Sequence, residues 1–481
     1  MPHIRNATSI TLHVAAVVLL ASCAPGGQPR LGAPGADRPS ECLIGDRAAT
    51  IGDTVTMALA EPTLPGDRAW PRSASERMVA AHLHETLVRV DCDGRVRPGL
   101  ARSWRREDLR LWVLTLRDDA AFADGSPVTA RDVQASWARH PAWALPATIR
   151  RTDDRTLTVE LPLETDDAIA VLAHPALAPV RAGSSSGSVV GAGSHRTSGS
   201  VDAARLALTS RRPGSPVLRV RRTSPADARN QIDLGVDVLV TDDAAAIEYA
   251  RGRGDRMVES LPWSHSYALL VPGRGVAGPS DEAEMLTALR DRMAADATRG
   301  SARAAAGPFW WQAAAHCQSV PGGAAQGLLG DATRPPRIVY DAGDRTARSI
   351  AERLVALAGF GEGTIERAMV YSAFPSLTGT TRLTAAGLSA ADLERAIEAG
   401  SAMAFVVSLP QRTLAPCLEL AAPGVTGIAV GATALEQRLL VPLIDIRPHL
   451  ITRRGAFAGT IDLLGAVRLR GADGVLAGSR R

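Results

Sequence analysis

The sequence contains no lysine, so all 54 of its basic residues are arginines. Aromatic residues make up only 4% of the chain, and the net charge is +4 over 481 residues. No basic run is interleaved with aromatics, which argues against a nucleic-acid partner. The short run of Arg219, Arg221 and Arg222 is therefore interpreted as a solvated strand edge. The heavy use of alanine, glycine and arginine indicates codon bias rather than function.

Catalytic signatures are scarce as well. The sequence has no H-E-x-x-H or Walker pattern, and we recognise no nucleophile, base and orienting acid in a catalytic motif. No two cysteines are spaced as metal ligands. His82 and His84 lie two residues apart on a predicted helix and point in different directions, so we interpret them as surface histidines. The sequence predicts a protein that is not an enzyme and has no cofactor or metal; a hydrolase with a spatially assembled triad is the alternative.

Only one stretch, near the start, is long enough and apolar enough to suggest targeting. Arg5 precedes the apolar run Ile10–Ala21, which is too short to span a bilayer as a mature helix. The run leads through Leu-Ala-Ser to Cys23, as in a lipobox, which predicts a lipoprotein signal peptide over residues 1–22 and acyl chains on Cys23. A plain secretory signal with an incidental cysteine is the alternative. Residues 23–41 are rich in glycine and proline and are predicted to be a disordered tether.

The stretch from residue 85 to 139 is the most informative part of the chain. A strand is predicted over Leu111–Arg117, because Trp112, Leu114 and Leu116 alternate with Val113 and Thr115. The turn signal Asp124-Gly125 follows. Thr129 then opens a helix, with Asp132 three residues later in a capping-box arrangement.

The order of these features resembles the bacterial extracellular solute-binding proteins of family 5, the dipeptide- and oligopeptide-binding components of ABC importers. The family pattern runs from an E-x-L-V segment through a P-x-L-A-x-S-W segment to F-x-D-G-x-P-V-T-A-x-D-V. The matching residues are Glu85, Leu87, Val88, Asp91, Gly94, Val96, Pro98, Leu100, Ala101, Ser103, Trp104, Leu116, Arg117, Phe122, Asp124, Gly125, Pro127, Val128, Thr129, Ala130, Asp132 and Val133.

This resemblance implies an α/β, two-lobed periplasmic-binding-protein fold, class II-like and of the large cluster C type, with a hinge of two crossing strands. Lobe I is then expected over residues 42–268, with a small subdomain at about 70–180. Lobe II is expected over 269–438, and residues 439–481 return to lobe I. The hinge strands are expected within residues 261–270 and 439–446.

The same resemblance suggests which residues line the cleft. Aromatic residues of the first hinge strand tend to face it, which points to Trp263, His265 and Tyr267, with core packing as the alternative. Trp310 and Trp311 line either a ligand pocket or the core of lobe II. Gly193 and Ser194 lie where the family has a turn beside the cleft. Residues 182–200 around them are predicted to be a flexible loop.

Helices and strands are predicted to alternate in the second half of the chain. Such alternation is typical of a parallel sheet covered on both faces. Ser389 is predicted to cap a helix, together with Asp392. The strands are predicted at residues 337–340, 366–371 and 403–407.

The family resemblance implies that two lobes close on a ligand and that the closed form docks on a membrane permease. Peptide-binding members place an aspartate after the strand near Val407 to pair with the ligand's amino terminus, whereas this chain continues as Ser408-Leu409-Pro410-Gln411-Arg412. We therefore expect a lipid-anchored, monomeric solute-binding protein of the cell envelope that faces the periplasm or the exterior and captures a peptide-like or other small solute. The missing aspartate implies that this solute is non-peptidic or lacks a free amine. A non-transport accessory or assembly lipoprotein on the same fold is the alternative.

The predicted export of the protein also affects which disulfides its cysteines are expected to form. With Cys23 assigned to lipid, Cys42, Cys92, Cys317 and Cys417 remain, an even number in an oxidising compartment. Three pairings are possible. The pairs Cys42–Cys92 and Cys317–Cys417 are favoured because each then lies within one expected lobe, and free buried thiols are the alternative.

Overall fold

The computed structural model describes one compact unit within Leu31–Arg481. The described residues are 42–46, 52–59, 74–140, 145, 147–161, 166–182, 189–198, 205–211, 216–222, 228–271, 280–297, 301–307, 309–310, 335–361, 363–374, 382–420 and 440–469. The signal peptide, Cys23, the tether, Trp311 and Cys317 lie outside these ranges, so the predictions about them stay predictions.

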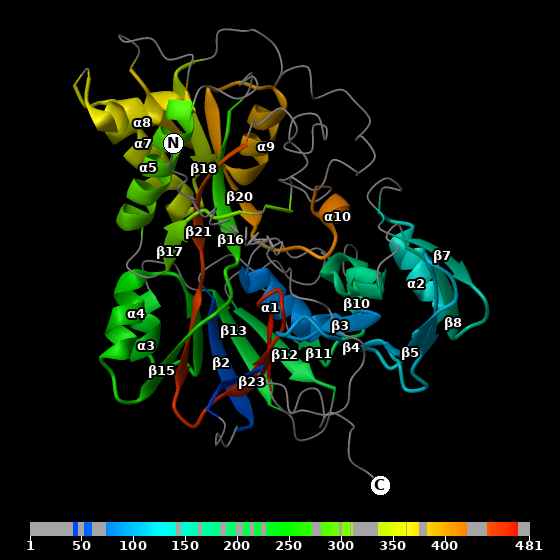
Figure 1. The fold of residues 1–481 in the computed structure, drawn as a ribbon. Helices are drawn as coiled ribbons and strands as arrows, with labels where there is room; N and C mark the ends of the chain where they lie inside the picture. The colour runs from blue at the N-terminus through cyan, green and yellow to red at the C-terminus, as the bar shows by residue number, and fades with distance from the viewer. Residues whose placement is uncertain are drawn as a thin grey trace, which may run out of the picture. The chain divides into compact units, whose positions relative to one another are not determined.

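Lobe I is built on a seven-stranded sheet in the order β11-β12-β13-β2-β14-β22-β15 (Figure 1). Its central strands β13, β2 and β14 are parallel, whereas β22 runs antiparallel to β14 and β15. Helix α1 packs on one face, and α3 and α4 pack on the other. The bounds are β2 Thr54–Leu59, α1 Ala74–Leu83, β11 His195–Ser198, β12 Arg205–Ser210, β13 Val217–Arg222, α3 Ala228–Asp233, β14 Val238–Thr241, α4 Ala244–Arg251, β15 Arg256–Ser260 and β22 His449–Arg453.

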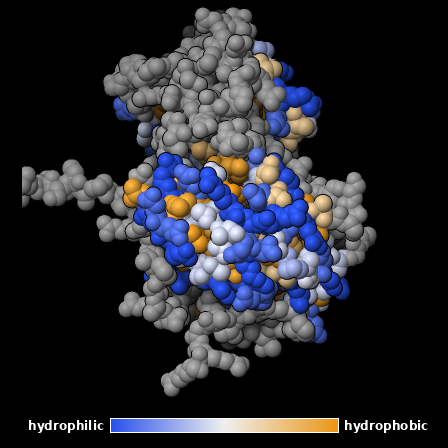
Figure 2. Space-filling model, turned by 90° about the vertical axis from the view of Figure 1, so that its right-hand side faces the viewer, coloured by the Kyte–Doolittle hydropathy of each residue, from blue (hydrophilic) through white to orange (hydrophobic). Residues whose placement is uncertain are grey.

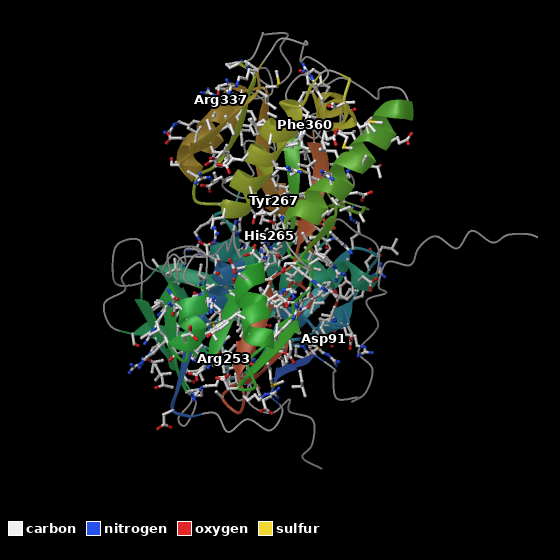
Figure 3. All side chains as sticks on the ribbon, turned by 90° about the vertical axis from the view of Figure 1, so that its left-hand side faces the viewer. Asp91, Arg253, His265, Tyr267, Arg337 and Phe360 are labelled. Atoms are coloured by element: carbon white, nitrogen blue, oxygen red, sulfur yellow. A yellow bond between two sulfur atoms is a disulfide. The ribbon has the colours of Figure 1, made fainter. Side chains whose placement is uncertain are left out.

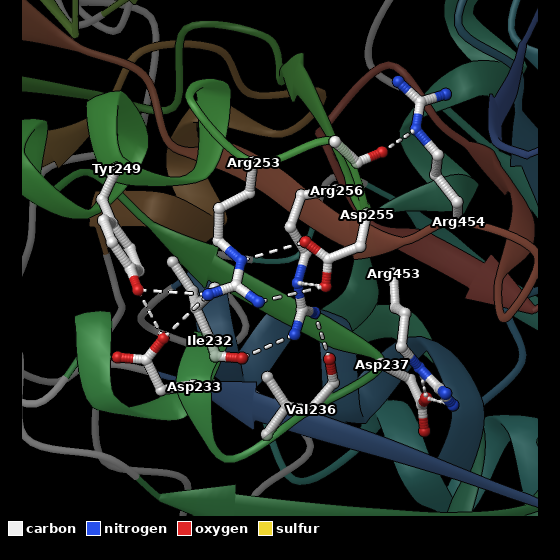
Figure 4. Close-up of polar contacts among 11 residues, drawn as sticks. Ile232, Asp233, Val236, Asp237, Tyr249, Arg253, Asp255, Arg256, Arg453 and Arg454 are labelled. Atoms are coloured by element: carbon white, nitrogen blue, oxygen red, sulfur yellow. Dashed lines mark hydrogen bonds and ion pairs between the residues drawn. The ribbon is translucent and has the colours of Figure 1, made fainter.

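Asp237 connects three of these strands through its carboxylate. One oxygen accepts a hydrogen bond from the backbone N–H of Thr56 on β2 at 2.8 Å, and the other accepts from Nε of Arg453 on β22 at 3.0 Å. Nearby, buried Arg256 donates to the backbone oxygens of Ile232 and Val236 (Figure 4). This polar network fixes the order of the strands at this end of the sheet.

Lobe II is built on a six-stranded sheet in the order β17-β21-β16-β20-β18-β19. Helices α5, α7 and α8 cover one face and α9 covers the other. The sheet is mixed, because β18 runs parallel to β19 and β20 while β16 runs antiparallel to β20 and β21. The predicted parallel sheet is therefore correct for only part of it. The bounds are β16 His265–Leu270, α5 Ser280–Ala297, β17 Ala302–Ala304, β18 Arg337–Asp341, α7 Arg345–Ala358, α8 Ile365–Ala373, β19 Thr384–Leu388, α9 Ala390–Glu398, β20 Ala404–Pro410 and β21 Leu440–Ile446.

The strand predicted over residues 366–371 is wrong, because this segment is part of helix α8. Thr364 caps the helix by accepting a hydrogen bond from the backbone N–H of Arg367. Val370 and Ala373, three residues apart, are buried against lobe II, whereas Ile365 is 63% exposed. The cap and the helical spacing of the buried residues outweigh the short run of strand-forming side chains.

The small subdomain is a four-stranded antiparallel sheet in the order β5-β6-β8-β7, covered by helix α2. The capping box predicted at Thr129 and Asp132 is present. Trp137 is 1% exposed and donates a hydrogen bond from its indole N–H to the backbone oxygen of Leu177 at 3.0 Å. The face seen in Figure 2 is mostly hydrophilic, with hydrophobic residues scattered among the polar ones. The bounds are β5 Ala101–Arg106, β6 Leu111–Leu116, α2 Ala130–Trp137, β7 Thr148–Arg151 and β8 Thr156–Glu160.

Three short sheets complete the described fold. A three-stranded sheet has the order β1-β23-β24, and β9 pairs with β10 as β3 pairs with β4. Cys42 and Cys92 form a disulfide, the pairing favoured from the sequence, which ties the segment before β1 to the β3–β4 turn. Cys417 is also disulfide-bonded, to a residue outside the described ranges. The bounds are β1 Leu43–Gly45, β3 Val88–Val90, β4 Val96–Pro98, β9 Val180–Ala182, β10 Val189–Gly191, β23 Ala458–Ile461 and β24 Val467–Leu469.

The glycine- and serine-rich segment differs from its prediction as a flexible loop. Residues 189–191 and 195–198 form β10 and β11, and Gly193 lies between them against the end of α1. A Cβ at Gly193 would lie 2.2 Å from the backbone oxygen of His82, and the N–H of Gly193 donates to the oxygen of Leu83 at 3.0 Å. Glycine is required here by close packing of two backbones.

Substitution of Gly193 by alanine is expected to destabilise the fold by about 2 kcal/mol, because the added methyl group overlaps backbone that cannot move aside easily. Urea unfolding monitored by circular dichroism measures the change. Gly254→Ala is the matched control, since a Cβ at Gly254 meets no atom within 4 Å. Equal stability of the two variants would contradict the packing role assigned to Gly193.

Candidate functional site

Two chain segments cross between the lobes, and they lie side by side. The first leads from β15 through Leu261 and Ser264 into β16, and the second leads from β21 into β22 (Figure 1). β16 and β21 pair antiparallel, with Ser266 opposite Asp445. This is the hinge of two crossing strands that the family resemblance implies.

Asp445 holds the hinge strands together. Its side chain is completely buried; one carboxylate oxygen accepts from the hydroxyl of Ser266 at 2.6 Å, and the other accepts from Nε of Arg303 on β17 at 3.0 Å. Arg303 also lies over the ring of Trp263, 4.3 Å from its centroid, and Arg447 lies 4.8 Å from the same ring. Trp263 is thereby fixed beside the hinge by two cation–π contacts.

A narrow recess opens where the hinge, lobe I and the end of β20 meet. Its walls include Arg77 of α1, His174, Trp263, Pro410, Arg412 and Glu419. The cavity volume is about 20 Å³, which is close to the space that one water molecule requires. Any larger solute can enter only if the walls move apart.

Histidine and glutamate meet across this recess. Nδ1 of His174 accepts a hydrogen bond from the backbone N–H of Ala176 at 3.2 Å. A neutral imidazole that accepts at Nδ1 carries its proton on Nε2. Nε2 therefore donates to the carboxylate of Glu419, at 3.0 Å. The His174 side chain is 3% exposed and that of Glu419 is 17% exposed, so the pair is largely shielded from water.

Glu419 belongs to a segment that leaves lobe II and packs elsewhere. After β20, residues 411–415 lead to the short helix α10 (Pro416–Leu420). Ala415 and Leu418 are buried in the hydrophobic core of the small subdomain rather than in lobe II. The recess is consequently bounded by both lobes and by a segment that joins them.

The structure separates the residues that were predicted to line a cleft. Trp263 lines the recess, and Trp310 adjoins it by donating its indole N–H to the backbone oxygen of Pro410 at 2.6 Å. His265 and Tyr267 lie on β16 near the junction of the lobes (Figure 3). Tyr267 is 8% exposed, lies in the core of lobe II and donates its hydroxyl to Asp344 at 2.9 Å, so core packing describes it.

Neither Gly193 nor Ser194 lines the recess. Gly193 lies against the end of α1, and the hydroxyl of Ser194 contacts the ring of His195. Sequence reasoning missed the four recess residues with ionisable side chains, which are Arg77, His174, Arg412 and Glu419. Their positions in the chain gave no common signal, because His174 and Glu419 alone are 245 residues apart. Only Arg412 had a local indication, as a charged residue just after a predicted strand.

A second cavity shares Arg77, Pro175 and Leu464 with the recess and extends into lobe I. His84 lines it, and burial lowers the pKa of His84 to about 4. Burial also raises the pKa of Asp462, which lines the same cavity.

The prediction of surface histidines is wrong, because His82 is 1% exposed and His84 is 7% exposed. Helix α1 buries both faces, one against β24 and β11 and the other against this cavity.

Comparisons with known proteins agree with this geometry. Residues 95–201 match the family described as bacterial extracellular solute-binding proteins, family 5 Middle. A segment of 132 residues is 32% identical to the periplasmic oligopeptide-binding protein OppA of Escherichia coli, covering 22% of this chain and 24% of that protein. A segment of 64 residues is 47% identical to the periplasmic murein peptide-binding protein MppA of the same organism, covering 13% and 12%. These sequence matches therefore span a quarter or less of each relative.

Solved structures extend the likeness to most of the chain. The Haemophilus influenzae OppA complex with the peptide RPPGFSPFR superposes with a TM-score of 0.59 at 16% identity, covering 84% of this chain and 95% of that one. NikZ from Campylobacter jejuni, in complex with Ni(L-His), superposes with a TM-score of 0.59 at 12% identity, covering 89% and 99%. At such low identity the likeness shows a common two-lobed fold. Among the described residues, none of the helices combines the length and hydrophobicity that crossing a bilayer requires.

Proposed function

We propose that this chain captures a small solute between its lobes for an ABC importer. Its middle segment matches the bacterial extracellular solute-binding proteins of family 5, and its fold is similar to that of OppA. The observation that carries the proposal is the recess at Trp263, which is bounded by both lobes and adjoins the two crossing strands. Pockets at domain junctions are the usual location of ligand sites.

The recess supports a mechanism of opening and closing. Because it has room for little more than one water molecule, a solute enters when the lobes separate about β16 and β21. Closure then buries the solute against Trp263, and the closed form is the one that the importer's permease recognises. No bond is made or broken in this cycle, so the chain needs no catalytic group.

We also propose that acyl chains on Cys23 hold the protein at the cell envelope, facing the periplasm or the exterior. The lipobox-like sequence before Cys23 supports this, and the following 18 or so residues would serve as a flexible tether. Mass spectrometry of the mature N-terminus checks the assignment; an unmodified Cys23 would contradict it.

Native mass spectrometry of the protein, purified without denaturation from its own host, tests solute capture. We expect a fraction of the molecules to carry a small solute, and we expect Trp263→Leu to lose it, because the variant lacks the aromatic wall of the recess. Phe360→Leu is the control, since Phe360 is 45% exposed on lobe II and does not line the recess. If neither the native protein nor the control ever carries or binds a solute, the non-transport accessory lipoprotein becomes the better explanation.

A further inference from the structure

The charges around the recess are not balanced. Four arginines surround it or contact its Trp263 wall, namely Arg77, Arg303, Arg412 and Arg447. Among the described residues, three carboxylates lie near these arginines: Glu419 on the recess wall, Asp445 beside Arg303, and Asp462 near Arg77. The local excess of positive charge contrasts with the nearly neutral chain as a whole.

All three carboxylates are already bound by protein groups. Glu419 accepts the Nε2 proton of His174, and it lies on the small-subdomain side of the recess. Asp445 is completely buried behind the hinge and is bound by Ser266 and Arg303, so a solute cannot reach it. In the adjoining cavity, the carboxylate of Asp462 accepts hydrogen bonds from the backbone N–H groups of Leu464 and Ala466. An ammonium group in the recess would therefore be close to arginines and would have to share the carboxylate of Glu419 with His174.

Arg412 is the cation best placed to bind a solute. It lines the recess, its side chain is exposed, and it has no ion-pair partner among the described residues. A guanidinium presents several N–H donors in a planar fork that matches a carboxylate or a phosphate. Closing the recess around such an ion pair would remove it from water and strengthen it.

We propose that the recess is an anion site, in which Arg412 binds a carboxylate or phosphate group of the solute while Trp263 packs against its remainder. This inference rests on the proposed function and specifies the class of solute. Arg77, which also lines the recess, adds a second positive charge, and the proposal excludes solutes whose recognised group is a free ammonium.

Isothermal titration calorimetry with three probes tests the proposal. N-acetyl-trialanine has a carboxylate and no ammonium, trialanine amide has an ammonium and no carboxylate, and inorganic phosphate separates phosphate from carboxylate recognition. We expect at least one of the two anionic probes to bind and trialanine amide not to bind. Arg412→Gln should weaken the anionic probe by about tenfold or more, because it removes a charge-assisted hydrogen bond. Arg412→Lys should retain part of the affinity.

Arg348→Gln is the matched control, because it removes the same charge from an exposed residue of lobe II that does not line the recess. The anion site is refuted if trialanine amide binds better than N-acetyl-trialanine, if neither anionic probe binds at millimolar concentration, or if Arg412→Gln and Arg348→Gln behave alike. A neutral or cationic solute recovered from the native protein would refute the anion site and leave solute capture intact. Absence of any bound solute, by contrast, counts against the proposed function itself.

Discussion

Lowering the pH from 7 to 5 is expected to reduce the free energy of unfolding by about 3 kcal/mol through two buried histidines. Burial lowers the pKa of His84 to about 4. Burial, with Arg447 and Arg251 nearby, lowers the pKa of His449 to about 4. Below the ordinary histidine pKa of about 6.5, the unfolded chain takes up protons at these sites while the folded chain does not. The unfolded state then binds more protons, so stability falls as the pH falls.

Asp462 and His140 also contribute to the dependence of stability on pH. The raised pKa of Asp462 acts in the opposite direction, because the folded state binds a proton there more readily than the unfolded chain. Burial also lowers the pKa of His140, which adds to the effect of His84 and His449.

Urea unfolding at pH 7, 6 and 5 measures this dependence. The variant His84→Gln is expected to have a shallower decline than the native protein, because one of the two main sites is then absent. His449→Gln should behave similarly, since His449 is 1% exposed and its Nδ1 has no hydrogen-bond partner within the described part of the chain. A native free energy of unfolding that stays constant from pH 7 to 5 would contradict the assignment of both histidines as buried and neutral.

Removing the disulfide between Cys42 and Cys92 is expected to cost about 4 kcal/mol, because it closes a loop of 50 residues. The bond restricts the unfolded chain, and in the folded state it connects the start of β1 with the turn between β3 and β4. The double variant Cys42→Ala with Cys92→Ala isolates this bond. Reduction with a thiol does not, because Cys417 is also disulfide-bonded.

Guanidinium unfolding of the double variant under oxidising conditions gives the measurement. The native protein in the same buffer is the reference, and the Cys417 disulfide stays intact in both. A loss of stability below 1 kcal/mol or so would mean that the unfolded chain gains little freedom when this loop is opened.

Local signals in the sequence predicted local structure well. The capping box at Thr129 and the cap at Ser389 are both present, because each depends on residues three positions apart. The strand predicted over Leu111–Arg117 is present as β6. The hinge strands followed from the family resemblance, and they pair as it implies.

Features that depend on distant packing were predicted poorly. Nothing in residues 366–371 alone distinguishes a strand from a helix that buries Val370 and Ala373. Similarly, His82 and His84 are buried because segments more than 100 residues away cover α1. The recess brings Arg77, His174, and the pair Arg412 and Glu419 together from three separate parts of the chain. Such a site becomes visible only when the fold is known.

Hydrogen–deuterium exchange with the recovered solute tests most directly whether the solute is held between the lobes. We expect it to slow exchange simultaneously in residues 174–177 of lobe I, in the crossing segment 261–264 and in residues 410–419 after β20, because all three border the recess. Protection confined to one lobe, or protection that spares all three segments, would contradict capture between the lobes.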